Sequence, residues 1–288
     1  MPSITSRTAL MALLAHPSRH SKSPIMHNAA FRALDIDAVY LAFDVTPERL
    51  PDAVQAIRAF QMRGVNLSMP HKEAVVPLLD ELAPEVRLTG AVNTIVNDGG
   101  RLTGCSTDGA GWLRALADLG FDVRGERVTI LGAGGAAKEM IARAAMQGAR
   151  SVAVFNRRAS SRWAHAETLV EQVRAQTGCD VTLHAMEDHD ALRREIGRSA
   201  LLANATDVGM GAQAGLSCIP DESYFHPELI VTDAIYAPPE TELLRQAREA
   251  GCRTQNGVGM MLYQGAESFR LWTGREMPVD LVRPLLGL

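Results

Sequence analysis

The chain has 288 residues, of which 47% are hydrophobic and 22% are charged, and its formal net charge is −4. This length predicts two domains, since single cores rarely grow much past about 250 residues, and the charge excludes the basic footprint that binds a nucleic-acid backbone. The chain has no apolar run of about 18 residues, so no membrane span is predicted, and four scattered cysteines without Cys-x-x-Cys spacing indicate reduced thiols of a cytoplasmic protein: Cys105, Cys179, Cys218 and Cys252.

Along the chain, apolar runs alternate with amphipathic stretches of helical length, which predicts an α/β fold of βα units with a parallel sheet. In the first third we expect strands at Leu10–Ala15, Val39–Phe43, Val65–Leu67 and Ala91–Val96, and helices at Pro24–Leu34, Pro47–Phe60 and Pro70–Val76. Each helix is expected to begin with its proline, whose missing N–H suits the first helical position. The stretch NDGGRLTG, residues 97–104, predicts a hairpin turn followed by a short strand.

After Gly125 the pattern restarts with a strand, a glycine turn, a helix and a second strand within about thirty residues. Further strands are expected at Val181–Leu183, Leu201–Asn204 and Ile230–Asp233, and a long helix at Met260–Trp272. Because no flexible linker separates the two patterns, we expect the domain junction to be a helix near Ala110–Leu119.

The glycine turn follows a strand that closes at Leu131, and it reads Gly132, Ala133, Gly134, Gly135, Ala136, Ala137. This is a G-x-G-x-x-A motif, in which Gly132 permits the tight turn and Gly134 lets backbone N–H groups approach a pyrophosphate at the helix start. A plain tight turn is the alternative. The complete strand-turn-helix-strand context favours a dinucleotide-binding site.

The second strand of this unit is followed by Asn156, Arg157 and Arg158. An NAD-selective site usually places a carboxylate there for the ribose 2′-hydroxyl, whereas two guanidinium groups favour a 2′-phosphate. A solvated basic turn is the alternative, because surface arginines are common. The sequence therefore favours NADP and leaves NAD open.

A group of polar side chains stands in the first third, beginning with Asn66, Ser68 and Lys72 in the stretch GVNLSMPHKEA. Lys72 is expected in the first turn of a helix, where the positive helix end disfavours an ammonium group. A solvent-facing lysine balanced by Glu73 is the alternative to a functional role. His16 and His20 have helical spacing, but Pro17 lies between them and no metal site is expected.

Three further segments carry polar groups with both a structural and a functional interpretation. Ser21 and Ser23 precede a helix, where Ser23 could be an N-cap or the pair could hold a carboxylate. Asn93 is expected inside an apolar strand, where an asparagine is unfavourable without a partner or ligand. Asp108 is expected at a helix start, where it could be only a cap. Strand ends and helix starts of open α/β sheets face the ligand crevice, so these groups predict a binding site.

With these residues in view, the chain resembles the shikimate dehydrogenase family. The family's motifs occur in its order and spacing over essentially the full length: HSKSP, VNLSMPHK, AVNT, TDG, GAGGAA, NRR, NAT and GVGMMLYQGA. The branch that oxidises both quinate and shikimate looks closest, from the stretches MRGVNLSMPHK, GAVNTIVND, FNRR and QGAESFRLWTG.

The resemblance implies a substrate-binding and catalytic α/β domain, residues 1–107 and 257–288, and an NAD(P)-binding Rossmann domain, residues 108–256, with a cleft between them. It implies an oxidoreductase that reversibly oxidises a cyclitol carboxylate at ring C3. The reaction would convert shikimate to 3-dehydroshikimate, quinate to 3-dehydroquinate, or both. Exposed strands of the first domain favour a homodimer.

The resemblance also implies a role for individual residues. Lys72 and Asp108 would form the catalytic pair, with the lysine exchanging a proton with the C3 oxygen. Ser21 and Ser23 would hold the carboxylate, while Ser68, Asn93 and Gln264, with the catalytic pair, would bind the ring hydroxyls and Tyr236 would lie near the cleft. The cofactor would contact Gly132, Ala133, Gly134, Gly135, Ala136, Ala137, Asn156, Arg157, Arg158, Thr206, Ala234 and Gly257.

Three positions depart from the family's patterns. Ser68 replaces the threonine of the biosynthetic branch, as in the quinate-type branch. Ala159 stands where that branch often has an acid that favours NAD, and Asp207 follows Thr206 where that branch can carry a lysine. These departures leave open both the choice between NADP and NAD and the choice between shikimate and quinate.

Two other functions fit the same scaffold. A catalytically silent ligand sensor would have no need of Lys72 and Asp108, and the chain has no evident DNA-binding segment. An amino-shikimate dehydrogenase would keep the chemistry and change the substrate. Turnover with NADP separates the sensor from either enzyme.

Overall fold

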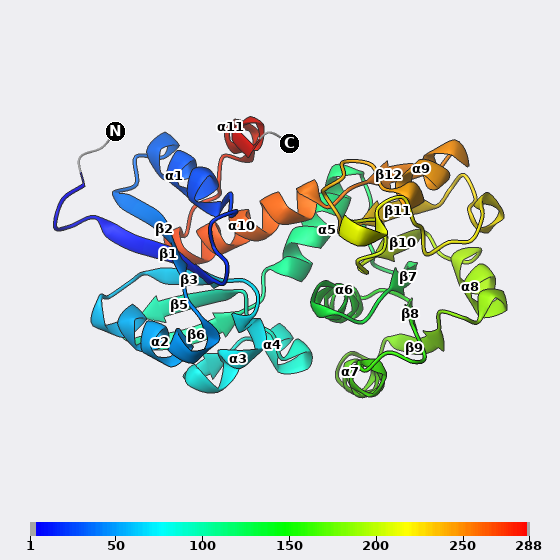
Figure 1. Cartoon of the computed structure of the whole chain (residues 1–288), viewed down its shortest axis with the longest axis horizontal. Helices are drawn as coiled ribbons and strands as arrows, with labels where there is room; N and C mark the ends of the chain where they lie inside the picture. The colour runs from blue at the N-terminus through cyan, green and yellow to red at the C-terminus, as the bar shows by residue number, and fades with distance from the viewer. Residues whose placement is uncertain (1–3, 287–288) are drawn as a thin grey trace. The chain divides into compact units, whose positions relative to one another are not determined.

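The computed structural model describes residues 4–286 and divides into two compact units (Figure 1). The first unit comprises Met1–Gly111 and Leu262–Leu288, and the second comprises Trp112–Met261. Both divisions fall within helices, α5 (Asp108–Asp118) and α10 (Val258–Thr273). The expected junctions were 107/108 and 256/257, so the observed ones at 111/112 and 261/262 lie four and five residues later.

The first unit contains a six-stranded sheet of order β2-β1-β3-β5-β6-β4. Its strands are β1 (Ala9–Ala15), β2 (Ala38–Asp44), β3 (Gly64–Leu67), β4 (Glu81–Leu82), β5 (Thr94–Asp98) and β6 (Arg101–Cys105). The expectation of a parallel sheet is wrong for the centre of this sheet, because β5 pairs antiparallel with both β3 and β6. The two-residue turn at Gly99 and Gly100, whose φ angles are 58° and 97°, closes the β5–β6 hairpin and so makes that pair antiparallel.

The helical elements of the first unit are short around the polar stretches. They are α1 (Ser23–Ala33), η1 (Pro47–Arg49), α2 (Leu50–Ala59), α3 (His71–Ala74), η2 (Val76–Leu78), α4 (Pro84–Thr89), α11 (Val279–Val282) and η5 (Arg283–Leu286), with the ends of α5 and α10. The prolines do not all open α-helices as expected: Pro24 is the second residue of α1, and Pro70 precedes α3. The α-helix expected over Pro70–Val76 ends at Ala74, since Pro77 offers no N–H to continue it.

An aromatic cluster packs one face of this sheet against α1 and α10. It consists of His27, Phe31, Tyr40, Phe269 and Trp272. A Cβ atom at Gly64 would lie 2.0 Å from Trp272 Nε1, so glycine is required for the indole to reach the strand. There the indole N–H donates to Ile95 O at 3.0 Å. The opposite face packs against α2 through an aliphatic cluster that includes Leu14, Val54 and Ile57.

His27 is fully buried in the aromatic cluster, and burial lowers its pKa from 6.5 to about 3. Within residues 4–286 neither of its ring nitrogens has a hydrogen-bond partner, and its ring stacks on Tyr40 at 4.4 Å between centroids. The folded state therefore holds this imidazole neutral, whereas the unfolded chain takes up a proton as pH falls below 6.5.

We expect His27 to cost stability as the solution is acidified. As pH falls from 6.5 to about 3, protonation of His27 in the unfolded chain should lower the free energy of unfolding, by about 1.4 kcal/mol per pH unit. Urea unfolding of the wild type and His27→Phe at a series of pH values measures it. The Phe variant keeps a flat ring and should lose stability less steeply in this window; parallel curves would contradict the assignment.

The second unit contains a parallel six-stranded sheet of order β12-β11-β10-β7-β8-β9. Its strands are β7 (Arg127–Leu131), β8 (Ser151–Asn156), β9 (Asp180–Ala185), β10 (Leu201–Asn204), β11 (Ile230–Asp233) and β12 (Arg253–Gln255). Its further helical elements are α6 (Gly135–Met146), α7 (Trp163–Thr177), α8 (His189–Ile196), α9 (Glu242–Glu249), η3 (Gly211–Gln213) and η4 (Glu222–Tyr224). The strand order reverses between β7 and β10, which is the Rossmann arrangement and confirms the predicted fold class.

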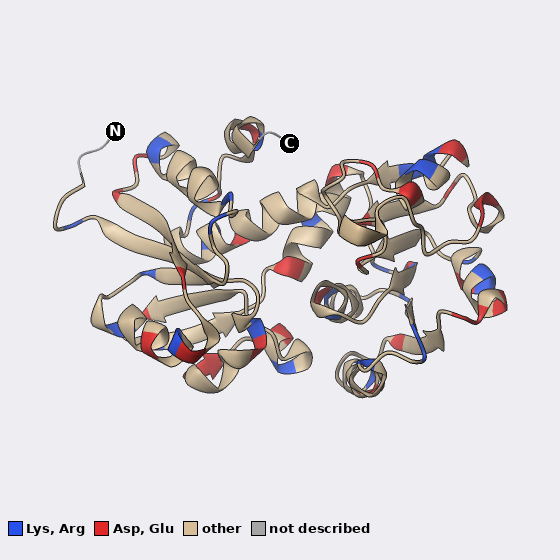
Figure 2. Ribbon diagram, in the orientation of Figure 1, with Lys and Arg blue, Asp and Glu red and all other residues tan. Residues whose placement is uncertain are grey.

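Charged residues of both signs are interspersed along the elements of each unit (Figure 2). No helix in the described part of the chain is both long and apolar enough to cross a membrane. Residues 4–286 contain no group of three or more His, Cys, Asp or Glu side chains that could hold a metal ion.

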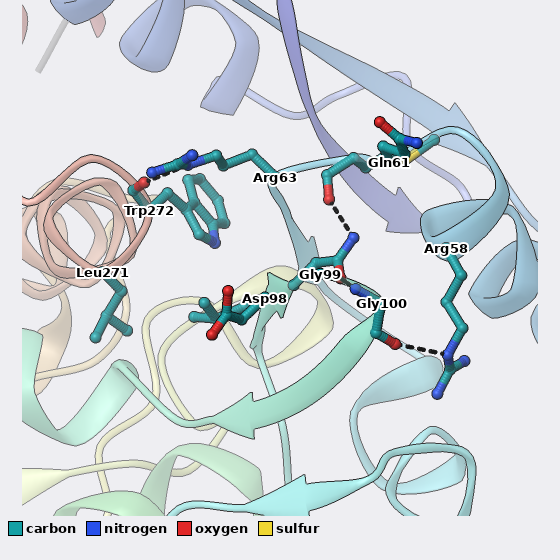
Figure 3. A pocket seen from close by; sticks show the side chains of 11 residues that line it. Arg58, Gln61, Arg63, Asp98, Gly99, Gly100, Leu271 and Trp272 are labelled. Atoms are coloured by element: carbon teal, nitrogen blue, oxygen red, sulfur yellow. Dashed lines mark hydrogen bonds between the residues drawn. The ribbon is translucent and has the colours of Figure 1, made fainter.

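A cavity of about 690 Å³ lies in the first unit beside the β5–β6 hairpin (Figure 3). The guanidinium of Arg58 donates to Gly100 O at 3.0 Å and to Asp80 at 2.8 Å, and Arg63 donates to Trp272 O at 3.0 Å. Arg58 therefore ties α2 to the hairpin and Arg63 ties the start of β3 to α10, whereas Ser68 and Lys72 follow the carboxyl end of β3.

Candidate functional site

An ion pair between Lys72 and Asp108 lies at the centre of the predicted site in the first unit. Lys72 Nζ is 2.6 Å from Asp108 Oδ2, and the two side chains are 31% and 14% exposed. Lys72 is carried by α3, which begins directly after the loop at the carboxyl end of β3. Asp108 is the first residue of α5, whose positive helix end favours its carboxylate. The sequence stretches that hold the two residues are 36 positions apart.

Asn93 connects this ion pair to the rest of the site. Its Nδ2 donates to Asp108 Oδ1 at 2.8 Å and lies 3.3 Å from Gln264 Oε1. The orientation of the Asn93 carboxamide is fixed at its oxygen, because Oδ1 accepts the backbone N–H of Thr107 at 2.8 Å. Both Asp108 oxygens are therefore used, one by an ammonium and one by an amide.

The expectation that Asn93 lies inside a strand is wrong, since β5 begins at the next residue, Thr94. Its backbone nevertheless bonds on both sides: Leu67 N–H donates to Asn93 O at 2.8 Å, and Asn93 N–H donates to Cys105 O at 3.2 Å. The regular pairing is interrupted here because the side chain of Asn93 turns to the start of α5.

Gln264 reaches the cluster because α10 approaches α5 closely. A Cβ atom at Gly111 would lie 2.5 Å from the backbone nitrogen of Gln264. Any larger residue at position 111 would push the two backbones apart. The short motif TDGAGW thus supplies both the carboxylate and, three residues later, the glycine that admits Gln264.

Asn66 is a buried residue that we noted in the sequence without assigning it a role. Its Oδ1 accepts from the Tyr40 hydroxyl at 2.9 Å, and its Nδ2 lies 3.1 Å from Asn93 O and 3.0 Å from Ser268 Oγ. An amide within the short apolar strand Val65–Leu67 was the signal for such a role, because a buried amide needs partners.

Ser21, Ser23 and Ser68 lie on the loops and helix start beside this cluster. Ser23 is the first residue of α1 and is preceded by Lys22 at the N-cap, so the alternative that Ser23 is the cap is wrong. Its N–H donates to Ser21 Oγ at 3.2 Å. Ser68 O accepts from His71 N at 2.9 Å, which places Ser68 in the turn that opens α3.

In the second unit the glycine turn has the geometry of a phosphate-binding loop. Gly132 has a φ of +104°, and a Cβ atom there would lie 3.0 Å from Ala205 O and 3.1 Å from Thr206 Cγ2. Helix α6 begins at Gly135, and Ala137 is fully buried against the sheet. The turn therefore leaves backbone N–H groups at the start of a twelve-residue helix, an arrangement that favours an anion.

Thr206, Ala234 and Gly257 lie at the carboxyl ends of neighbouring strands in the same unit. Thr206 follows β10, and its hydroxyl donates to Asn204 Oδ1 at 2.7 Å. A Cβ atom at Gly257 would lie 2.0 Å from Ala234 O, so only glycine fits there. Tyr236, 46% exposed, also belongs to this unit, whereas Lys72 belongs to the first.

The residues after β8 form a basic turn. Arg157 and Arg158 are exposed, and the Arg158 guanidinium lies over the Trp163 ring at 4.4 Å. A carboxylate from elsewhere in the chain bonds to this turn, since Glu187 Oε2 accepts the Arg158 backbone N–H at 3.2 Å from 29 residues further along the chain. Asn156 is buried at the end of β8.

Arg162 is a candidate contact that the sequence interpretation missed. Its Nη1 lies 3.2 Å from the position that a Cβ atom would take at Gly134, so its guanidinium lies against the glycine turn. A third arginine five residues after Arg157 was the available signal.

Two family models match the chain. The model described as the shikimate dehydrogenase substrate binding domain matches residues 13–95. The model described as the shikimate 5′-dehydrogenase C-terminal domain matches residues 257–286.

Curated relatives match over nearly the full length. A protein of Listeria innocua named shikimate dehydrogenase (NADP(+)) is 49% identical over 283 residues, covering 98% of this chain and 97% of that protein. One of Streptococcus pyogenes with the same name is 50% identical over 287 residues, covering 99% and 98%.

Solved structures agree. Shikimate 5-dehydrogenase of Listeria monocytogenes, in complex with shikimate and NAD, is 48% identical with a TM-score of 0.96 and 99% of both chains covered. Quinate dehydrogenase of Corynebacterium glutamicum, in complex with NAD, is 29% identical with a TM-score of 0.86, covering 98% of this chain and 99% of that one. The chain therefore belongs to the shikimate dehydrogenase family.

Proposed function

We propose that the protein is an NADP-linked dehydrogenase that reversibly oxidises shikimate to 3-dehydroshikimate. The observation that carries the proposal is the Lys72–Asp108 ion pair, 2.6 Å between Nζ and Oδ2, held by Asn93 in a chain of this family. When bound, the nicotinamide cofactor supplies or takes up the hydride.

In this reaction Lys72 exchanges the proton on the substrate's C3 oxygen. For reduction of the ketone, the Lys72 ammonium donates a proton to the oxygen that becomes the C3 hydroxyl, and for oxidation the neutral amine accepts it. Asp108 holds the ammonium in place through Oδ2. The position of Asp108 Oδ2 thus sets the direction of the Lys72 side chain. Both side chains are partly exposed, so the ion pair exchanges protons with solvent.

The neighbouring polar groups are suited to a ring with several hydroxyls and one carboxylate. Asn93 and Gln264 present amide groups beside Asp108, and Ser68 stands at the turn before Lys72. Ser21 and Ser23 lie at the start of α1, where a helix end and two hydroxyls favour a carboxylate. Tyr236 is proposed to contact substrate from the second unit.

The second unit fits a dinucleotide phosphate. The Gly132 turn and the start of α6 offer N–H donors, and a side chain at position 132 would contact Ala205 and Thr206. We assign the cofactor phosphates to the Gly132–Ala137 turn, and the 2′-phosphate to Arg157 with Arg158, Arg162 and Asn156 nearby. Thr206, Ala234 and Gly257 complete the proposed contacts at the strand ends.

Replacement of Arg157 by alanine should distinguish the two cofactors. Loss of a charge-assisted contact to the 2′-phosphate should raise the KM for NADP at least about tenfold, with a much smaller change for NAD. Steady-state kinetics with each cofactor measure this, and Arg198→Ala, an exposed arginine after α8, is the matched control. Equal effects on both cofactors would remove Arg157 from the phosphate site.

Quinate oxidation is a second candidate because Ser68 stands where the quinate-type branch also has serine. A two-by-two kinetic comparison of shikimate and quinate with NAD and NADP tests both candidates. Turnover of shikimate with NADP supports the main proposal. Binding of these acids without any turnover would instead support a ligand sensor, and turnover of an amino-shikimate alone would change the substrate.

We further propose a homodimer and a cytoplasmic location. The edge strand β2 exposes Leu41 at 45% and Phe43 at 37%, which supports self-association. The four cysteines are free, which suits a reducing compartment. Sedimentation analysis at several protein concentrations tests the homodimer, and a purely monomeric species would contradict it.

A further inference from the structure

Ser268 lies on α10 one turn after Gln264 and is completely buried. Its Oγ is 3.0 Å from Asn66 Nδ2, 2.8 Å from Thr94 Oγ1 and 3.2 Å from Thr107 Oγ1, and it donates to Gln264 O at 3.0 Å. One hydroxyl thus joins β3, β5, the segment before α5, and α10. We propose that Ser268 is a positioning residue that sets the orientation of Asn93 toward Asp108, an inference that rests on the proposed function.

The direction of these hydrogen bonds follows from the number of protons available. Ser268 has one hydroxyl proton, and Gln264 O is an acceptor only. With that proton used, Ser268 Oγ is left to accept from the Asn66 amide and from one of the two threonine hydroxyls. The remaining threonine proton is directed to Asn93 Oδ1, which lies 3.0 Å from Thr94 Oγ1 and 3.2 Å from Thr107 Oγ1.

The orientation of Asn93 decides whether Asp108 is held. In the observed orientation Nδ2 donates to Asp108 Oδ1 at 2.8 Å. A carboxamide rotated by half a turn would place its oxygen against that carboxylate oxygen, two acceptors facing each other, and its amide against the Thr107 N–H, two donors. Removing the Ser268 hydroxyl leaves one threonine proton without its acceptor, whereas the Asn66 amide keeps Asn93 O and Thr94 Oγ1, each at 3.1 Å. The threonine protons are then redistributed around Asn93 Oδ1, which weakens the preference for the observed orientation.

The second unit offers a matched control in Ser199. It is also buried, its Oγ donates to a backbone carbonyl four residues earlier (Glu195 O, 2.9 Å), and it pairs with Thr129 Oγ1 at 2.8 Å. It lies between α8 and β10, and neither of these hydrogen bonds involves a residue of the proposed site. Ser199→Ala thus removes the same kind of hydrogen bonds with no path to Asn93.

The first experiment compares Ser268→Ala and Ser199→Ala in the full chain. Both should lower the unfolding temperature to a similar degree. With shikimate and NADP, only Ser268→Ala should lower kcat, by about tenfold for a displaced polar group, with the KM for NADP within twofold of wild type. Ser268→Thr, which keeps the hydroxyl, should recover part of the loss. Unchanged kcat in Ser268→Ala, or an equal fall in Ser199→Ala, overturns the proposal.

A double-mutant cycle tests the route through Thr94. If Ser268 acts through Thr94, the double variant Thr94→Val/Ser268→Ala should lower kcat by less than the product of the two single fold-changes. In the control double variant, Ser268→Ala/Ser199→Ala, the fold-changes in kcat should multiply. Multiplicative effects of the first pair would contradict the route.

Side-chain amide exchange tests the inference without turnover. In ¹⁵N-labelled protein the Asn93 carboxamide protons should exchange slowly in wild type and Ser199→Ala, and at least about tenfold faster in Ser268→Ala. Slow exchange in all three overturns the positioning role whatever the activity. Absence of shikimate turnover in wild type with faster exchange in Ser268→Ala would instead refute the proposed function and keep the positioning role.

Discussion

Lys72→Ala should lower kcat for shikimate oxidation at least about 100-fold, the usual contribution of a positioned general acid or base. The substitution removes the group that exchanges the C3 proton, and the Asp108 carboxylate loses its 2.6 Å partner. The KM values should change much less, because Asn93, Gln264 and the serines remain. Steady-state kinetics with both substrates saturating measure the effect.

Arg101→Ala is the control for this substitution. Arg101 forms an exposed ion pair with Glu81 in the same unit, and within residues 4–286 no hydrogen bond joins either residue to Lys72, Asp108, Asn93 or Gln264. It should leave kcat within about twofold of wild type, as expected for a surface ion pair. Near-normal turnover of Lys72→Ala would remove Lys72 from the proton-transfer role.

Asp108→Asn should impair turnover on the same order, about 100-fold. The native carboxylate accepts from Lys72 through Oδ2 and from Asn93 Nδ2 through Oδ1. An asparagine has one acceptor oxygen, so whichever way it turns, its NH₂ group faces another donor. Loss of either contact misplaces the lysine or the asparagine.

The matched control for Asp108→Asn is Asp98→Asn, an exposed carboxylate at the end of β5. It makes the same chemical change in the same unit and should leave kcat and the KM values unchanged. A wild-type kcat in Asp108→Asn, with normal folding, would show that the carboxylate is not needed to hold Lys72.

The strands with continuous apolar runs were predicted closely. Residues Leu201–Asn204 and Ile230–Asp233 are β10 and β11 as expected, and β1 and β2 differ from prediction by one residue at their ends. Such runs are typical of parallel strands with both faces covered, which holds for β10 and β11, whereas β2 is an edge strand that exposes Leu41 and Phe43. The short edge strands β4 and β12 were missed, since Glu81–Leu82 and Arg253–Gln255 carry no comparable apolar pattern.

The antiparallel centre of the first sheet could not be deduced from alternating strands and helices. The Gly99–Gly100 turn indicated a hairpin, but only the pairing of β3 with β5 shows how that hairpin joins the parallel strands. Likewise Asn93 looked like a strand residue by its apolar neighbours, and the turn of its side chain toward α5 interrupts the strand.

By itself the sequence determined the α/β class, the family, the glycine turn and which side chains are chemically fit to act, because residue type and short-range spacing carry that information. Only the tertiary structure decided which of them meet. Lys72 and Asp108 are 36 residues apart, and Glu187 reaches Arg158 from 29 residues away. Gln264 reaches Asn93 across 171 residues only because Gly111 lets two helices touch. Distances of 3 Å between remote segments depend on how backbones pack, and no local pattern in the chain records that packing.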